Sequence, residues 1–406
     1  MTAPRRVVIT GIGAITALGT GAEALWAGAL DARCGIRPIA SIATNRLTVS
    51  HAAEVPGYDP AAHFQPRELP MLDRAAQFAL IAAREAAAES GAAEAIARLP
   101  PARAGVVLAA PIGLETYDAA AQALYGENAR RLHPMTVPRI MPNAPASQIS
   151  MAFGIRGPSF AVASACASAT HAIGLAFHMI RAGMLDMAVS GGSDASIVLG
   201  FMKAWDALRV LSPDVCRPFS KDRAGLVIGE GAAILVLEEY NHARARGAPI
   251  HAELAGFGMS ADAGELTAPD AAGAARAMRA ALEDAAMAPE DVDYVNAHGT
   301  GTRLNDRTEV AALADVFGAH LQSMPVSSTK SMHGHCLNAA GAVELALCAQ
   351  ALRHGILPPT IGYREPDPEC GVDCVPNAAR PAAIRTALSN SFAFGGLNAA
   401  LLLRAA

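Results

Sequence analysis

Apolar runs of strand length alternate with segments of helical spacing along this 406-residue chain. Strands are predicted where Val, Ile, Leu and Ala crowd together, at RRVVIT, 104–110, 159–163 and 186–192, with a helix at 71–90. A second helix follows Cys166 and ends near Gly183, because apolar side chains recur at Ile173, Phe177, Ile180 and Met184. Such alternation is typical of α/β layering with buried, largely parallel strands.

The same order of elements recurs in the second part of the chain. Helix 273–287 leads to strand 291–297, and strand 324–330 leads to a histidine loop, helix 337–353 and strand 356–360. A repeat of this kind predicts a duplicated unit. We expect an N-terminal half at 1–249 and a C-terminal half at 250–406, joined at the charged segment EEYNHARARGAP (238–249).

Composition excludes several classes of protein. The chain is 52% apolar and carries a net charge of −5, which offers no general attraction for nucleic acid or anionic lipid. No run reaches the roughly 18 apolar residues of a membrane span, and the glycine-broken start MTAPRRVVITGIGAIT does not fit a signal peptide. The seven cysteines have no spacing typical of disulfides or zinc. We therefore expect a cytoplasmic protein with no membrane insertion and no nucleic acid partner.

Two glycine-rich segments invite a nucleotide-binding interpretation that their residues do not support. GIGAITALG (11–19) has Thr16 where the third glycine of a dinucleotide fingerprint should stand. RPFSKDRAGLVIGEGAA (217–233) lacks the Gly-Lys-Ser/Thr of a P-loop.

Cys166 lies in SACASAT (164–170), three residues after an apolar strand and directly before a helix. This placement brings free backbone N–H groups and the positive end of the helix dipole toward the sulfur, and it predicts a lowered thiol pKa. Free cysteine is also among the residues most often buried as filler. Position alone does not decide between nucleophile and filler.

Two histidines occupy comparable turns, His298 in NAHGTGT and His335 in STKSMHGHCLNAAG. Each follows a predicted strand and is flanked by Gly and small polar residues, so that a substrate can approach the imidazole. Together with Cys166 they could supply a nucleophile and two imidazole donors or bases. His333, two residues from His335, complicates this spacing argument.

Charged residues and a glycine turn surround these histidines in the sequence. Lys330, Asp306 and Glu309 are either surface ion pairs or groups that orient an imidazole. LSNSFAFGGLNAALLL (388–403) predicts a strand, a glycine turn and a strand. That turn is either a simple hairpin or a source of backbone N–H donors for an oxyanion.

Seven segments, in register along essentially the whole chain, resemble the β-ketoacyl-acyl carrier protein synthases of the KAS I/II type, within the thiolase-like superfamily. They are RRVVITGIGAITALG, GPSFAVASACASA, RPFSKDRAGLVIGEGAA, VNAHGTGT, STKSMHGH, AAGAVE and NSFAFGG. The phrases RPFSKDR, GTRLNDRTE, KSMHGHC and YREPDPEC are similar to the nodulation-type ketosynthase subgroup. The resemblance implies an α/β fold, the duplicated thiolase-like α-β-α-β-α sandwich, usually assembled as a homodimer.

The same resemblance implies a 3-oxoacyl-[acyl carrier protein] synthase, an acyltransferase of fatty acid or specialised polyketide-like chain elongation. Cys166 would accept the acyl group from acyl carrier protein, and His298 and His335 would stabilise the enolate formed when the malonyl group loses CO2. Two neutral imidazoles can donate N–H bonds to an enolate without protonating it. No organic cofactor is required.

Further roles follow from the resemblance. Lys330 would support the histidines with Glu309 as its partner and Asp306 nearby, and the backbone amides of Cys166 and Phe394 would form the oxyanion hole, with Phe394 as a gate. Substrate contacts are implied for Thr300, Thr302, Trp205, Phe392 and Gly395. A monovalent or divalent cation site is implied for Asn296, Glu344, Ser389 and Asn390.

The chain departs from the family pattern at Ala169, Ala393, Leu397 and Trp205, which leaves the acyl substrate and the gating open. Docking of an acidic carrier would need cations near the pocket. The candidates are Arg67, Arg74, Arg130, Arg131, Lys203 and Arg209.

Three alternative functions compete with a condensing enzyme. A non-catalytic chain-length-factor-like partner of another ketosynthase would lack the nucleophile, and Cys166 argues against it. A thiolase would carry a second cysteine in the C-terminal glycine loop, where this chain has SFAFGGLN. A papain-like hydrolase would predict neither the duplication nor a second essential histidine.

Overall fold

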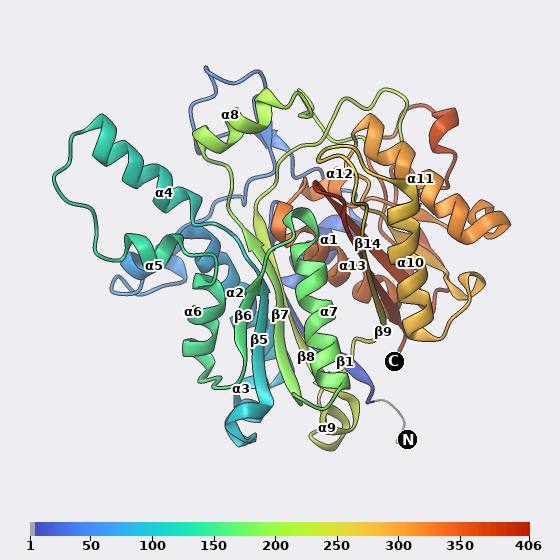
Figure 1. The fold of residues 1–406 in the computed structure, drawn as a ribbon, viewed down its shortest axis with the longest axis horizontal. Helices are drawn as coiled ribbons and strands as arrows, with labels where there is room; N and C mark the ends of the chain where they lie inside the picture. The colour runs from blue at the N-terminus through green and yellow to red at the C-terminus, as the bar shows by residue number, and fades with distance from the viewer. Residues whose placement is uncertain (1–4) are drawn as a thin grey trace.

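The computed structural model describes residues 5–406, in which a mixed sheet of 11 strands runs through the molecule between layers of helices (Figure 1). Ten strands lie in the order β6-β5-β7-β8-β1-β9-β15-β14-β10-β11, and β2 (Gly19–Thr20) pairs with β1. The sheet has two halves, which join where β1 (Val7–Thr16) pairs antiparallel with β9 (Ala252–Ala261).

The two halves repeat one arrangement of strands. Outward from the joint, one half runs β1, β8, β7, β5, β6 and the other runs β9, β15, β14, β10, β11. The predicted duplication is thus confirmed in the sheet itself, whereas the boundary at residue 249 stays a prediction. The first half contains β5 (Ala104–Ala109), β6 (Ser159–Val162), β7 (Met187–Asp194) and β8 (Gly231–Glu239). The second contains β10 (Tyr294–Asn296), β11 (Val326–Ser327), β14 (Thr386–Ala393) and β15 (Leu397–Arg404).

The prediction of largely parallel strands is wrong. Only the outer strands of each half are parallel, β7 with β5 and β5 with β6, and likewise β14 with β10 and β10 with β11. The long strands near the joint are antiparallel. Strands covered on both faces read as continuous apolar runs in either direction, so their sequences do not reveal which way they run.

Five layers result from this sheet and its helices. Helix α2 (Arg74–Ser90) packs on the outer face of the first half, and α10 (Ala271–Ala285) on the outer face of the second. Between the halves, α7 (Ser168–Arg181) and α13 (Ala340–His354) pack against each other and against strands. An α-β-α-β-α sandwich is therefore confirmed. The buried position of α13 explains why it is apolar on nearly all sides.

Close packing between layers depends on small residues at the contact. A Cβ atom added to Gly13 on β1 would overlap the carbonyl oxygen of Ala82 on α2. Glycine is therefore required there for the helix to lie directly on the strand. The glycines of GIGAITALG serve packing, not nucleotide binding.

Two local predictions, those for segment 356–360 and for Met184, differ from the structure. Segment 356–360 forms only β12 (Ile356–Leu357), which pairs with β13 (Arg380–Pro381) outside the main sheet, because the two prolines that follow cannot donate to a ladder. The counterpart of β7 is instead β14. The junction 238–249 contains helix α9 (Tyr240–Ala245), and Met184 lies beyond α7 with 58% of its surface exposed. Within residues 5–406, no helix is long and apolar enough to cross a membrane.

Candidate active site

Cys166 lies in a single 3-10 turn, η5 (Ala165–Ala167), between β6 and α7. The chain turns sharply because Ala165 has φ 48°, and the cysteine is 8% exposed. Ser168 Oγ accepts the N–H of Ser164 at 2.8 Å and donates to the carbonyl of Ala165 at 2.7 Å, which fixes the turn. The predicted strand, turn and helix around Cys166 are all present.

One pocket of about 120 Å³ brings Cys166 together with His298 and His335. His298 follows β10, and His335 follows the short helix α12 (Lys330–His333) in the same half of the sheet. Their ring centroids lie 5.3 Å apart in an edge-to-face arrangement. Cys166 of one half thus shares a pocket with two imidazoles of the other half, as the sequence predicts.

Most of the predicted substrate contacts line the same pocket. They are Thr300, Thr302, Trp205 and Phe392, and the predicted gate residue Phe394 lines the pocket with them. Gly395 is not among the lining residues, because its N–H donates to the carbonyl of Leu266 at 2.7 Å and holds it in the loop, whereas Gly396 does line the pocket.

Burial decides the protonation states in this pocket. Burial raises the pKa of the Cys166 thiol to about 12, against the opposing effect of the Lys330 ammonium. Burial, with Lys330 adding to it, also holds the pKa of His298 and of His335 well below the usual value. The predicted low thiol pKa is therefore not found, since loss of solvation outweighs favourable charge. The site holds a neutral thiol beside two neutral imidazoles.

Lys330 is fully buried, and its ammonium pairs with Glu344 on α13. The prediction that Glu309 is its partner is wrong, because the carboxylate of Glu309 instead accepts the backbone N–H groups of His298 at 2.8 Å and Gly299 at 2.7 Å. Burial raises the pKa of Glu309 and of Glu344 to about 7. Glu309 therefore shapes the loop that carries His298, without orienting its ring.

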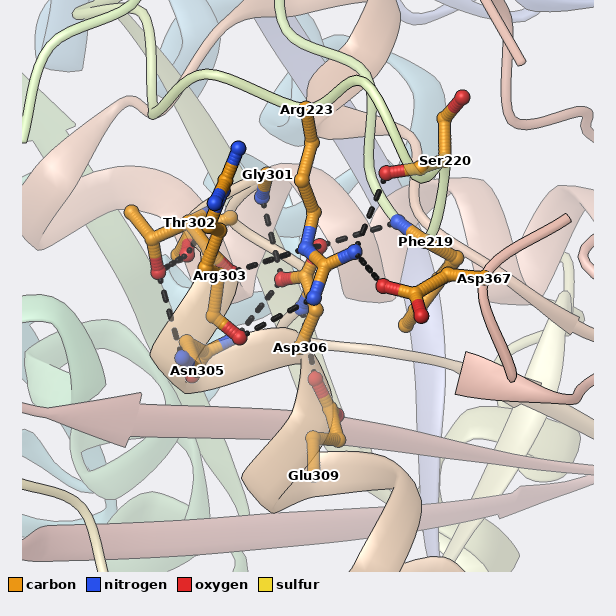
Figure 2. Close-up of polar contacts among 12 residues, drawn as sticks. Phe219, Ser220, Arg223, Gly301, Thr302, Arg303, Asn305, Asp306, Glu309 and Asp367 are labelled. Atoms are coloured by element: carbon orange, nitrogen blue, oxygen red, sulfur yellow. Dashed lines mark hydrogen bonds and ion pairs between the residues drawn. The ribbon is translucent and has the colours of Figure 1, made fainter. Parts of the chain in front are cut away.

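Asp306, three residues before Glu309 on the same helix, holds the same loop (Figure 2). Its carboxylate accepts the N–H groups of Phe219 at 3.0 Å and Gly301 at 3.1 Å, and it lies 3.6 Å from the guanidinium of Arg223. Arg223 also pairs with Asp367. Neither alternative weighed from the sequence applies to Asp306. Its ion pair with Arg223 is buried, not on the surface, and its carboxylate contacts backbone N–H groups, not an imidazole. In residues 5–406 the Nδ1 atoms of both pocket histidines have no hydrogen-bond partner.

Arg223 was missed by reasoning from the sequence. Its guanidinium, 2% exposed, donates to the carbonyls of Ser220 and Arg303, each at 3.1 Å, and so ties segment 217–223 to the start of α11 (Arg303–Phe317). The only signal in the sequence was the apolar stretch that follows Arg223 in segment 217–233, which was compared only with the P-loop pattern.

The residues predicted to bind a cation share an unusual property. Asn296 Oδ1, Glu344 Oε2, Ser389 Oγ and Asn390 Oδ1 are buried without a hydrogen-bond partner in the described part of the chain. Asn296 and Ser389 are paired on the neighbouring strands β10 and β14. Unpaired buried oxygens are costly, and oxygen is the ligand that hard cations prefer. Asn296, Glu344 and Ser389 therefore fit a small hard cation, whereas the side chain of Asn390 lies on the other face of β14, where its Nδ2 donates to Glu309 at 3.3 Å.

The cations predicted for carrier docking are mostly on the surface. Arg74 is the exception, because it pairs with Glu230 at 2.6 Å and lies 4.8 Å over the rings of Tyr58 and Phe78. Lys203 is exposed but pairs with Asp206 at 2.8 Å. The exposed members of the set are Arg67, Arg130, Arg131, Lys203 and Arg209.

The four departures from the family pattern fall in two places. Trp205 on α8 (Leu199–Ala207) stacks on Phe394 at 5.9 Å between centroids, and Leu397 lies at the end of the same glycine turn, 36% exposed. Ala393 is partly buried against the apolar cluster that contains Cys166. Ala169 is fully buried, and a Cβ atom on Gly192 would lie 3.1 Å from its methyl, so Ala169 fills the space left by that glycine.

Known proteins are similar to this chain in sequence and in fold over nearly its full length. The model of the beta-ketoacyl synthase N-terminal domain matches residues 4–243, and that of the C-terminal domain matches 251–364. The chain is 49% identical over 400 residues to nodulation protein E of Rhizobium sp. (strain N33), covering 98% of this chain and 99% of the relative. It is 40% identical over 412 residues to 3-oxoacyl-[acyl-carrier-protein] synthase 2 of Staphylococcus aureus (strain COL), covering 100% and 99%.

A solved structure agrees with these sequence matches. The ishigamide ketosynthase/chain length factor superposes with a TM-score of 0.94 at 38% identity, covering 100% of both chains. This chain belongs to the β-ketoacyl synthase family.

Proposed function

We propose that this acyltransferase catalyses the decarboxylative Claisen condensation of an acyl group held on Cys166 with a malonyl group, and that acyl carrier protein delivers both. The observation that carries the proposal is the meeting of Cys166, His298 and His335 in one pocket. The name of the staphylococcal relative, an acyl-carrier-protein synthase, supports the choice of carrier. A non-catalytic partner subunit would have no use for this set of residues.

Acylation comes first in this proposal. The Cys166 sulfur attacks the carbonyl carbon of the acyl thioester, and a neutral pocket imidazole accepts the thiol proton as the new S–C bond forms. The old thioester bond then breaks, and the carrier leaves as a thiol after taking up that proton. Backbone N–H groups at Cys166 and Phe394 are the proposed donors to the transient oxyanion.

Condensation follows on the acylated enzyme. The malonyl carboxylate leaves as CO2, and its electron pair forms an enolate whose oxygen accepts N–H bonds from His298 and His335. Because burial and Lys330 keep both imidazoles neutral, they stabilise the enolate without quenching it. The enolate carbon attacks the acyl carbonyl, the C–C bond forms and the bond to Cys166 breaks. The two half-reactions predict ping-pong kinetics.

The test mixes the protein with acyl- and malonyl-acyl carrier protein and measures CO2 and 3-oxoacyl product. We expect wild type and Cys370→Ala, a buried cysteine outside the pocket, to form acyl-enzyme and product, and Cys166→Ala to form neither. His298→Ala should form acyl-enzyme but little product. If wild type accepts no acyl chain of any length, the condensation proposal is wrong and a non-catalytic role follows.

A homodimer is part of the proposal. Large apolar side chains are exposed around the β6 edge of the sheet, on α4 (Leu114–Ala121), α5 (Thr136–Ile140) and α6 (Ala144–Phe153), which project beside it (Figure 1). An exposed sheet edge flanked by apolar side chains marks an interface. The largest exposed fractions are those of Tyr117 (60%), Tyr125 (82%), Val137 (67%) and Met151 (67%). Light scattering should give a dimer, and Phe160→Glu on β6 should give a monomer.

A bound cation and a cytoplasmic location complete the proposal. The unpartnered oxygens of Asn296, Glu344 and Ser389 would hold a monovalent or divalent ion, which would supply structural charge without entering the reaction. Metal analysis of the purified protein, with Asn296→Ala as the variant that loses the ion, tests this. The location is supported by the seven free cysteines, six of them buried.

A further inference from the structure

The turn that carries Cys166 has a counterpart in the other half of the molecule. This counterpart is the 3-10 turn η8 (Leu337–Ala339), which leads directly into α13 as η5 leads into α7. Both turns begin with a residue of positive φ, 48° at Ala165 and 44° at Leu337. The two turns pack against each other. In this register, Asn338 occupies the position that Cys166 holds in the first half.

Asn338 is tied to a buried carboxylate at the end of β7. Its Nδ2 donates to Asp194 Oδ2 at 2.8 Å, and Asp194 is 1% exposed. The other carboxylate oxygen, Oδ1, has no hydrogen-bond partner among residues 5–406. Asn338 Oδ1 lies 3.4 Å from Ser168 Oγ, the hydroxyl that fixes the nucleophile turn through Ser164. A continuous path of polar contacts therefore joins β7 to the turn of the nucleophile.

We propose that Asn338 and Asp194 are positioning residues for the nucleophile: together they hold the Cys166 turn, and the carboxylate charge of Asp194 sets the pH at which the thiol reacts. Neither residue lines the substrate pocket, so both act through Cys166. The inference rests on the proposed function, because it takes Cys166 as the acyl acceptor.

The groups that face Asp194 make its charge sensitive to pH. Burial raises the pKa of Asp194 to about 7, while hydrogen bonds from Ser196 and Asn338 oppose that rise. Glu230 adds to the rise, and its own charge is balanced by Arg74 at 2.6 Å. Asp194 therefore changes charge within the pH range in which the enzyme would work.

The groups that face Cys166 carry both signs. The ammonium of Lys330 favours the thiolate, and the carboxylates of Asp194 and Glu344 oppose it. The remaining neighbour of Asp194, Cys336, is a neutral thiol whose pKa burial raises, so it contributes no charge. Removing the Asp194 charge without changing its shape should therefore favour the Cys166 thiolate.

The test measures alkylation of Cys166 by iodoacetamide against pH in the full chain, read by mass spectrometry of the Cys166 peptide. In Asp194→Asn the midpoint should fall by about one pH unit, which is about tenfold more thiolate at a fixed pH below the midpoint. Ser193→Ala is the matched control, because Ser193 is the buried neighbour of Asp194 and its hydroxyl has no partner in residues 5–406. Its midpoint should equal that of wild type.

A second arm measures the rate of Cys166 acylation by octanoyl-acyl carrier protein. Asn338→Ala should slow acylation about tenfold, because the Cys166 turn loses one of the contacts that position it. The exchange variant Asp194→Asn with Asn338→Asp restores the hydrogen bond and should recover most of that rate. A purely structural role would lower the melting temperature without moving the alkylation midpoint.

Two results would overturn the inference. One is a folded Asp194→Asn protein with the wild-type alkylation midpoint. The other, which holds even if Asp194→Asn does not fold, is an Asn338→Ala protein that is acylated as fast as Ser193→Ala. Alkylation does not require condensation, so a chain that shows the midpoint shift but makes no 3-oxoacyl product refutes the proposed function alone.

Discussion

Replacing Arg223 by Met tests how the loop of His298 is held in place. The side chains of Arg223 and Asp306 are 2% and 0% exposed and lie 3.6 Å apart, so solvent does not screen their interaction. Removing one partner of a buried pair costs about 3–5 kcal/mol, because the other charge stays buried. Methionine replaces the apolar stem of the arginine but leaves Asp306 without its ion-pair partner and also breaks the ion pair with Asp367.

The loss of stability in Arg223→Met should grow with pH. Burial raises the pKa of Asp306 in the folded protein, and Arg223 opposes that rise. Without Arg223 the folded-state pKa rises further above the unfolded value of about 3.9. The folded state then holds a proton that the unfolded state has released. Stability is therefore retained at low pH and lost as the pH rises through the folded-state pKa.

The assay is the urea midpoint of unfolding at pH 5 and pH 8, compared with that of Arg307→Met. Arg307 lies on the same helix as Asp306, α11. The side chains of its ion pair with Glu369 are 52% and 59% exposed, and such pairs contribute about 0–1 kcal/mol. Arg223→Met should lower the midpoint more than this control at both pH values, and by more at pH 8. Equal shifts in the two variants, or a shift in Arg223→Met that does not change with pH, would refute the reasoning.

Three further perturbations follow from the pocket. Lys330→Met removes the ammonium that favours the thiolate, so the alkylation midpoint of Cys166 should rise by about one pH unit. Trp205→Ala removes the ring that stacks on Phe394, and acylation assays with a series of chain lengths should show longer chains gaining on the order of tenfold in relative rate. Gly396→Ala places a side chain at φ 68° against a neighbour, which should cost about 1–3 kcal/mol and slow acylation, measured by melting temperature and acyl-enzyme formation.

The sequence was sufficient to predict which groups meet in the pocket because their signals are local. Cys166, His298 and His335 each follow a predicted strand and sit among small residues, and the resemblance to a known family implies their roles. The repeated strand order of the two halves could be predicted only in part. Spacing reveals a repeat, but it does not give the direction of strands that are buried on both faces.

Interactions between distant segments could not be predicted in the same way. Arg223, in a loop, meets Asp306 on α11, and Lys330 meets Glu344 only because α13 lies between the sheet halves. The neutral state of Cys166 depends on how completely the folded pocket excludes water, which no spacing of residues records. Local pattern therefore identifies the reacting groups, and tertiary contact determines their partners and charge.

The central position of β1 has a consequence for how the chain folds during synthesis. Val7 on β1 pairs with Glu239 on β8 and with Leu254 on β9, so β1 finds both of these partners only after more than 200 further residues have been made. At a translation rate of about 5–20 residues per second, β1 waits on the order of ten seconds or longer with both edges unpaired. An apolar strand in that state is prone to aggregation. We therefore expect chaperone supply, more than final stability, to limit the yield of this protein in cells.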